Sequence, residues 1–265
     1  MNNKKITILG SGNIGLSIAK GLTHSKLVSP AQIILTRRNI ELLKEFSEQG
    51  FSISNDNKKA VKESDIIIVA VQPQQLDELL MQIKPALKLK KHMVISVVSG
   101  ASISAIKKIL GNQIVIVRAM PNTAIAIQES MTCLASDSPE GLAAAEKIFN
   151  VLGTSLIINE ELMGPATALC ACGLAFFLRA IRAASQGGIE IGFHSADAII
   201  MAAQTAKGAA SLLLVNKNHP ESEVDKVTTP RGITISGLNQ MEHNGFSSAL
   251  IKGIVTSAEK AAKIY

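Results

Sequence analysis

The sequence predicts an α/β protein in which a doubly wound parallel sheet is followed by an all-helical C-terminal region. Short apolar runs rich in Ile and Val alternate with helical patterns as far as residue 160. This alternation is typical of parallel sheets that carry helices on both faces. After residue 160 only helical patterns follow. We therefore expect one domain at residues 1–160 and a second at residues 161–265.

Each expected strand is a short aliphatic run between polar or turn-forming residues, as strands buried on both faces usually are. Only 3% of the residues are aromatic, so the core must be built from Ile, Val, Leu and Ala. The expected strands are Lys5–Leu9, Gln32–Thr36, Ile66–Val71, Met93–Val97, Ile114–Ala119, Thr132–Ala135 and Thr154–Ile158. The helical patterns between them are Asn13–His24, Asn39–Gln49, Asp56–Glu63, Gln74–Lys84, Ser102–Leu110 and Glu140–Val151.

The C-terminal region is expected to be helical because Ala, Gly and Ser recur there at helical spacing. The expected helices are Glu161–Ala184, Ser195–Val215, Gly232–His243 and Ser247–Ile264. Such apolar helices usually need a partner subunit to cover them, so we expect a homodimer. The uncharged run 162–178 approaches the length of a membrane span. Its small residues favour a buried helix, and we expect no membrane insertion.

Composition narrows the function classes. The formal net charge is +6, but no basic run alternates with aromatic residues. This favours an enzyme for anionic ligands over a nucleic-acid-binding protein. The three cysteines (Cys133, Cys170, Cys172) and the five histidines lack metal-ligand spacing, so no metal site is expected. An odd cysteine count and the absence of a secretory leader before Lys5 predict reduced thiols and a cytoplasmic protein.

A glycine-rich segment follows the first expected strand and opens the first expected helix. Its spacing, G-x-G-x-x-G, is that of a dinucleotide-binding turn. The first glycine permits the tight turn, the second lets the backbone approach a pyrophosphate, and the third lets the helix pack on the strand. The helix N-terminus then faces the phosphates. The expected phosphate-binding residues are Gly10, Ser11, Gly12, Asn13, Ile14 and Gly15.

The end of the second expected strand distinguishes NADPH from NADH. An acidic residue there would bind a ribose 2′-hydroxyl, but the sequence has Thr36, Arg37 and Arg38 instead. Two guanidinium groups suit a 2′-phosphate. We predict that NADPH is preferred and that NADH remains possible; a solvated basic loop is the alternative. At the end of a later strand, where ligands of such sheets bind, further cofactor contacts are expected from Ala70, Val71, Gln72 and Pro73.

Taken together, these segments and several later ones resemble the pyrroline-5-carboxylate reductase family over nearly the whole chain. The segments that carry the resemblance are Gly10–Gly15, Ala70–Gln74, Ser99–Gly100, Val117–Thr123, Gln204–Ala209 and Val227–Gly237. The resemblance implies an N-terminal Rossmann domain and a C-terminal helical dimerisation domain, with dimers that often assemble into decamers. It also implies reduction of the cyclic imine 1-pyrroline-5-carboxylate to L-proline by NAD(P)H.

The resemblance also places substrate residues. The backbone N–H groups of Gly232, Ile233 and Thr234 are expected at a helix start, where free donors can hold a carboxylate. Thr234 and Thr229 are the candidate catalytic residues, with Thr234 positioning the ring nitrogen; N-capping is the alternative role for both hydroxyls. Three residues after the last core strand complete the set. Met120 and Pro121 are expected beside the substrate, and Asn122 is expected to bind the cofactor or to form only a turn.

Two departures from the family pattern leave alternatives open. Arg231 replaces a glycine of the turn, and the segment Ala168–Phe176 has thiols or methyls where the family has hydroxyls, with Leu174 in place of a proline. A related imine or β-hydroxyacid reductase is one alternative, for which Lys207 would be the helix-borne acid or base. A catalytically silent NADP-binding sensor is the other.

Overall fold

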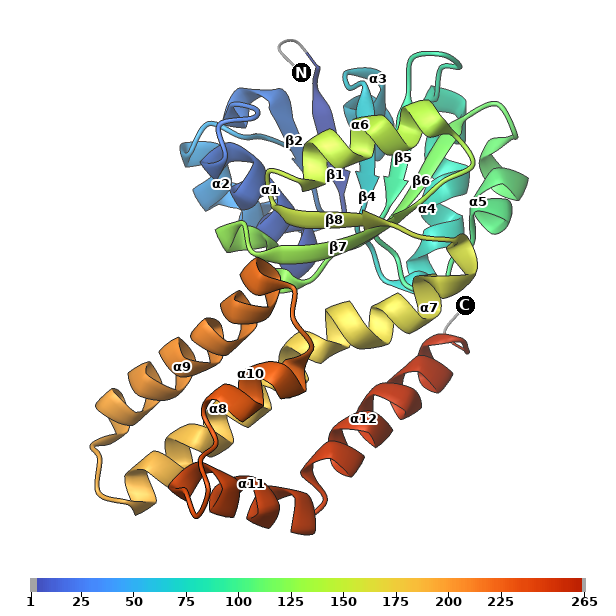
Figure 1. Ribbon diagram of the computed structural model, residues 1–265. Helices are drawn as coiled ribbons and strands as arrows, with labels where there is room; N and C mark the ends of the chain where they lie inside the picture. The colour runs from blue at the N-terminus through green and yellow to red at the C-terminus, as the bar shows by residue number, and fades with distance from the viewer. Residues whose placement is uncertain (1–3, 264–265) are drawn as a thin grey trace. The chain divides into compact units, whose positions relative to one another are not determined.

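A computed structural model describes residues 4–263, and its first part is a single eight-stranded sheet (Figure 1). The strand order is β3-β2-β1-β4-β5-β6-β7-β8, and every neighbouring pair is parallel except β6 and β7. The strands are β1 Ile6–Leu9, β2 Ile33–Thr36, β3 Ser52–Ser54, β4 Ile66–Val69, β5 Met93–Ser96, β6 Val115–Met120, β7 Ser130–Ala135 and β8 Gly153–Ile157. The predicted fold class, a doubly wound sheet followed by helices, is confirmed.

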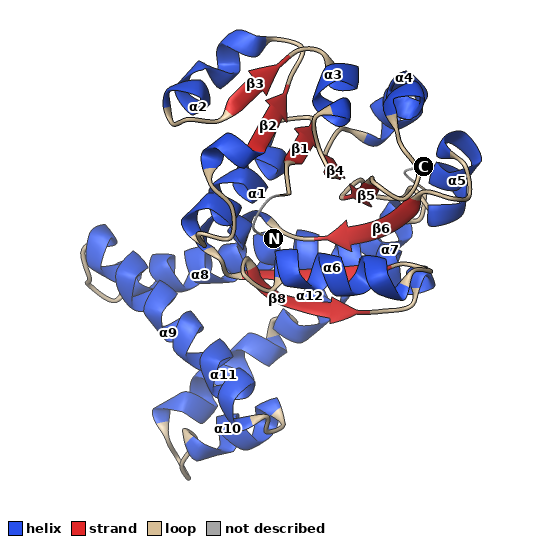
Figure 2. Cartoon of the chain, turned by 90° about the horizontal axis from the view of Figure 1, so that it is seen from above, coloured by secondary structure: helices blue, strands red, loops and turns tan. Residues whose placement is uncertain are grey.

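Helices cover both faces of the sheet because side chains alternate along each strand. Ile6 and Ile8 join the core on one face, under α1, α2 and α6, whereas Leu9 joins the core on the other, with α3, α4 and α5. Figure 2 shows α3, α4 and α5 on one side of the strands and α1 and α6 on the other. The helices are α1 Asn13–His24, α2 Lys44–Glu48, α3 Asn57–Lys62, α4 Leu76–Ile83, α5 Ile103–Leu110 and α6 Pro139–Phe149.

Several of these helices begin where a short polar side chain caps them. The Asp56 carboxylate accepts a hydrogen bond from the backbone N of Lys59, and the Ser102 hydroxyl accepts one from the backbone N of Ala105. Each such cap satisfies one of the four N–H groups that a helix start leaves without an internal partner. These caps explain why α3 and α5 start close to the residues that the sequence predicts.

The sheet differs from the expectation in three places. Strand β3 was not expected, because its Ser52–Ser54 sequence is too polar to read as a buried strand. The helix expected at 39–49 is a 3-10 turn, Ile40–Leu43, followed by the short α2. Strand β7 runs antiparallel to β6, since only residues 121–129 separate them and a parallel crossover needs a dozen or more residues.

The rest of the chain is helical within the described residues. It comprises α7 Met163–Ala166, a π-helical turn Thr167–Cys172, α8 Gly173–Glu190, α9 Ser195–Asn216, α10 Pro220–Lys226, α11 Ile233–His243 and α12 Phe246–Ala261. The sequence did not predict α10 or the π-helical turn, and the expected helix end at Ile264 lies outside the described residues. The chain divides into two compact units, one with residues up to Cys172 and from Ser257, the other Gly173–Thr256. Each is described by itself.

Two helical segments are long and apolar enough to cross a membrane, judged by length and composition alone. They are Glu160–Glu190 and α9, and little of either is buried within the chain. The second unit exposes large apolar side chains along them, among them Phe177, Leu178, Ile200 and Leu214. An apolar surface of this extent in a globular chain marks a contact with a partner or a membrane.

Candidate active site

A cavity of about 580 Å³ lies at the carboxyl ends of β1, β2 and β4, where ligands of doubly wound sheets bind. It lies wholly within the first compact unit. Nine of the expected cofactor residues line it: Gly10, Ser11, Gly12, Thr36, Arg37, Arg38, Ala70, Val71 and Gln72. These residues are distant in sequence and come together because parallel strands end at the same edge of the sheet.

The three glycines of the G-x-G-x-x-G turn have different surroundings. A Cβ on Gly10, whose φ is +94°, would lie 2.6 Å from the carbonyl oxygen of Ala70. A Cβ on Gly15 would lie 2.5 Å from the carbonyl oxygen of Gly10. A Cβ on Gly12 would meet no atom within 4 Å. Gly10 and Gly15 therefore serve the close packing of strand, loop and helix, whereas the space beside Gly12 stays empty and opens on the cavity.

The polar groups around this space suit an anion. Gly12 is the N-cap of α1 and brings no side chain to cap it, so the first N–H groups of the helix remain as donors. The Ser11 hydroxyl is buried, and within residues 4–263 it has no hydrogen-bond partner. An unpaired buried hydroxyl costs stability, which a bound ligand that pairs with it would recover. The loop thus fits the pyrophosphate of a dinucleotide.

Two arginines border the same cavity at the end of β2. Arg37 donates from Nη1 to the carbonyl oxygen of Ser11 at 3.1 Å, which holds its guanidinium against the glycine loop. The Arg38 Nη2 lies 4.0 Å from the Glu78 carboxylate, but both side chains are 81% exposed. An ion pair this exposed and this long is weak, so Arg38 remains free to bind a phosphate.

The other expected cofactor residues do not line the cavity. Asn13, Ile14 and Gly15 lie in the first turn of α1, and Pro73 starts the 3-10 turn that precedes α4. Asn122 is buried after β6. Its Oδ1 accepts from the backbone N of Ala124 at 3.0 Å, and its Nδ2 donates to the carbonyl oxygen of Cys170 at 3.2 Å. The Asn122 side chain therefore ties the β6–β7 turn to the π-helical turn.

The two residues before Asn122 are also buried. Met120 packs with Cys133, Met163 and Ala166 in a small apolar cluster of the first unit, so its side chain faces that core. Pro121 is buried beside it. Contact of either residue with a substrate would therefore involve backbone atoms or the proline ring rather than the Met120 thioether.

The Thr229–Thr234 turn lies in the second unit, immediately before α11. The backbone N of Gly232 donates to the carbonyl oxygen of Thr229 at 2.8 Å, which closes a four-residue turn. Pro230 and Arg231 are its central residues, and Arg231 has a φ of +61°. Proline followed by a positive φ defines a type II turn, whose third position favours glycine. Arg231 thus adopts a backbone conformation that glycine favours.

The start of α11 leaves donors for a ligand. Gly232 is its N-cap and provides no side-chain cap, and a Cβ there would lie 2.5 Å from the Thr229 hydroxyl. Within the described residues neither Thr229 nor Thr234 uses its hydroxyl in a hydrogen bond, so neither acts as an N-cap here. Ile233 is 95% exposed. The hydroxyls and the first N–H groups of α11 are therefore available together on one short segment.

Sequence reasoning missed part of the cavity wall. The missed lining residues are Asn39, Leu42, Asn55, Asn57, Gln75, Glu78, Leu79 and Gln82. Asn57 donates to the Gln82 amide oxygen at 2.9 Å, which joins α3 to α4 on this wall. Recognising β3 would have revealed Asn55, because residues directly after a parallel strand lie at the ligand-binding edge.

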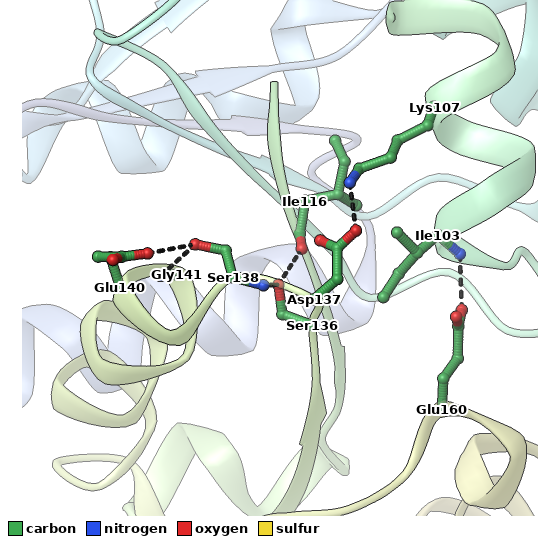
Figure 3. A network of polar contacts seen from close by, with 9 residues as sticks. All are labelled: Ile103, Lys107, Ile116, Ser136, Asp137, Ser138, Glu140, Gly141 and Glu160. Atoms are coloured by element: carbon green, nitrogen blue, oxygen red, sulfur yellow. Dashed lines mark hydrogen bonds and ion pairs between the residues drawn. The ribbon is translucent and has the colours of Figure 1, made fainter. Parts of the chain in front are cut away.

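A separate polar network surrounds a larger, open hollow of about 1380 Å³ beside α5. Figure 3 shows Glu160 reaching the start of α5 and Asp137 reaching Lys107. The Glu160 carboxylate accepts from the backbone N of Ile103 at 2.6 Å and pairs with Nη1 of Arg118 at 3.1 Å. Only 7% of the Arg118 side chain is exposed. Arg118 therefore anchors β6 to the segment that leads into α7.

Comparison with known proteins gives a consistent picture. Residues 160–264 match the family model described as pyrroline-5-carboxylate reductase dimerisation. Residues 5–100 match the one described as NADP oxidoreductase, coenzyme F420-dependent.

Relatives match over nearly the whole chain. Pyrroline-5-carboxylate reductase 1 of Dictyostelium discoideum is 56% identical over 98% of this chain, which spans only 50% of that protein's length. Pyrroline-5-carboxylate reductase 2 of the same organism is 53% identical over 99% of this chain and 93% of that protein. The solved structure of Plasmodium falciparum pyrroline carboxylate reductase with NADP bound is 24% identical, with a TM-score of 0.89 over 100% of this chain and 99% of that one. The chain belongs to the pyrroline-5-carboxylate reductase family.

Proposed function

We propose that this chain reduces 1-pyrroline-5-carboxylate to L-proline with NADPH. The observation that carries the proposal is the cavity at Gly12, where an empty space, free helix N–H groups and an unpaired buried hydroxyl meet two arginines. Family membership supplies the substrate class, since the relatives are named for pyrroline-5-carboxylate. NADP in the Plasmodium structure supports the choice of cofactor.

The residues of the first unit bind and orient the cofactor. The N–H groups at the start of α1 and the Ser11 hydroxyl hold the pyrophosphate. Because Gly12 has no side chain, it leaves space for the pyrophosphate oxygens. Arg37 and Arg38 bind the ribose 2′-phosphate by charge-assisted hydrogen bonds. NADPH is therefore preferred to NADH. Gln72 and the residues next to it at the end of β4 bind the remainder of the cofactor along the edge of the sheet.

The residues of the second unit bind the substrate. The N–H groups of Gly232, Ile233 and Thr234 hold its carboxylate, and the Thr234 hydroxyl orients the ring nitrogen. Thr229 lines the same pocket. When bound, NADPH would supply a hydride to the imine carbon, and the nitrogen would take a proton from water, so that the C=N bond becomes CH–NH. The protein's contribution is position, because an oriented pair of reactants reacts far faster than a free one.

The exposed apolar side chains of α8 and α9 are covered by a second copy of the chain. Their position within the region that matches a dimerisation family supports this assignment. Burial in a dimer accounts for the two apolar helices without a membrane, and such dimers can assemble further into decamers. The working form is then a cytoplasmic homo-oligomer with no nucleic-acid partner.

The test follows NADPH absorbance with pyrroline-5-carboxylate and with its six-membered homologue. Rapid oxidation of NADPH with the five-membered imine, and slower oxidation with NADH, is expected. Failure of both imines to oxidise NADPH would reject the proposal and favour a silent NADP-binding protein. Near-normal turnover of Lys207→Ala is expected as well, because the proposed chemistry gives Lys207, on α9, no acid or base role. Loss of turnover in that variant would favour a lysine-dependent reductase.

A further inference from the structure

Two cysteine sulfurs meet in the first unit although their residues are far apart in sequence. The Sγ atoms of Cys133, on β7, and Cys170, in the π-helical turn, are 3.8 Å apart. Cys133 is 4% exposed, and Cys170 is half-buried beside the same apolar cluster. Cys172 is two residues further along the π-helical turn and is also a free thiol. Within the described residues it makes no such sulfur contact.

We propose that Cys133 and Cys170 form a redox-modification site that closes to a disulfide under peroxide. The Cys170 thiolate attacks hydrogen peroxide, the O–O bond breaks, and after uptake of a proton the products are a sulfenic acid and water. The Cys133 thiol then attacks the Cys170 sulfur, the S–O bond breaks, and a second water leaves. The two sulfurs lose two electrons in total, and the peroxide gains them.

The surroundings of the two thiols assign these roles. A hydrogen bond from the Cys133 thiol lowers the pKa of Cys170 to about 7, which outweighs the opposing effect of burial. The same hydrogen bond, together with burial, raises the pKa of Cys133. The thiolate is the reactive form of cysteine, so the more accessible Cys170 reacts first. Cys133, protonated and in contact with it, is placed to resolve the sulfenic acid.

Closure of this disulfide changes the geometry around Asn122. A disulfide requires a sulfur–sulfur distance of about 2.05 Å, so the two sulfurs, now 3.8 Å apart, must approach each other. The carbonyl oxygen of Cys170 accepts the hydrogen bond from Asn122 Nδ2, and the backbone N of Asn122 donates to the Ser130 hydroxyl. A shift of the Cys170 backbone on closure is therefore transmitted to the β6–β7 turn. An effect on turnover rests on the proposed function and on the expectation that Met120 and Pro121, next to this turn, contact the substrate.

The first experiment treats the full-length protein with hydrogen peroxide, denatures it, alkylates the remaining thiols and measures the intact mass. We expect the number of alkylated thiols to fall from three to one, with a non-reduced peptide that links residues 133 and 170. Cys172→Ser should still form this link, whereas Cys133→Ser and Cys170→Ser should not. Retention of all three thiols, or a link that includes Cys172, would overturn the inference.

The second experiment measures NADPH oxidation in each variant before and after peroxide, relative to its own reduced form. The wild type and Cys172→Ser should lose at least ten-fold in kcat/KM and recover with dithiothreitol. Unchanged turnover in protein shown to carry the disulfide would reject the transmission to the β6–β7 turn. Reduced protein that oxidises no NADPH would instead reject the proposed function, while the mass measurement would still decide whether the disulfide forms.

Discussion

Replacing Gly12 by alanine separates cofactor binding from folding. The added Cβ would meet no atom within 4 Å, and Gly12 already has an extended backbone that alanine accepts. The free energy of unfolding should therefore change by less than about 0.5 kcal/mol. The methyl group would occupy the space that the pyrophosphate needs. We expect the Kd for NADPH to rise at least about ten-fold, which corresponds to about 1.4 kcal/mol of binding free energy.

Gly15→Ala is the matched control, because it adds the same methyl group three residues away. Its Cβ would lie 2.5 Å from the Gly10 carbonyl oxygen and 3.1 Å from Cγ2 of Ile8. Neither backbone nor core can yield easily, so this variant should lose about 1–3 kcal/mol of stability. Isothermal titration with NADPH and thermal unfolding would be measured on both variants. A Gly12→Ala protein with wild-type affinity, or one as destabilised as Gly15→Ala, would refute the assignment of the cavity.

Four further substitutions test other parts of the account. Arg37→Ala and Arg38→Ala should each lower kcat/KM for NADPH by about 10- to 100-fold, since a charge-assisted hydrogen bond contributes about 1.5–3 kcal/mol. The kcat/KM for NADH should change little. An equal loss of kcat/KM with both cofactors would show that the arginines do not bind the 2′-phosphate. Arg231→Gly should raise the free energy of unfolding by up to about 1 kcal/mol in chemical denaturation, because glycine accepts the +61° φ without strain. A less stable variant would show that the arginine side chain holds the turn. Glu160→Ala should lower the free energy of unfolding by about 3 kcal/mol, because it leaves the buried Arg118 guanidinium and a helix N–H without their partner. The exposed neighbour Glu161, changed to alanine, should be neutral in the same denaturation curves, and equal losses in the two variants would contradict the role of Glu160.

Much of the first unit could be predicted because its strands are continuous aliphatic runs. Strands β1 and β4 are entirely buried, and such runs leave little ambiguity between helix and strand when glycines and polar turns bound them. Strand β3 was not predicted because Ser52 and Ser54 carry no apolar signal. Its backbone pairing with β2 is what makes it a strand. The missing strand also hid Asn55 from the cavity wall.

The parts that could not be predicted depend on contacts between distant residues. The helix α10 has only seven residues and no buried side chain, so hydrophobic periodicity could not reveal it. The approach of Cys133 to Cys170 arises from the packing of β7 against the π-helical turn, which neither sequence segment specifies alone. The glycine turn, by contrast, was predictable in place, because a single local spacing encodes it.

The most direct test of the proposed activity follows the transferred hydride. The enzyme would be incubated with pyrroline-5-carboxylate and NADPH that carries two deuterium atoms at C4 of the nicotinamide. The account predicts L-proline with one deuterium at C5, formed in equal amount to the NADP⁺ produced. Proline without deuterium, or consumption of NADPH without proline, would contradict it.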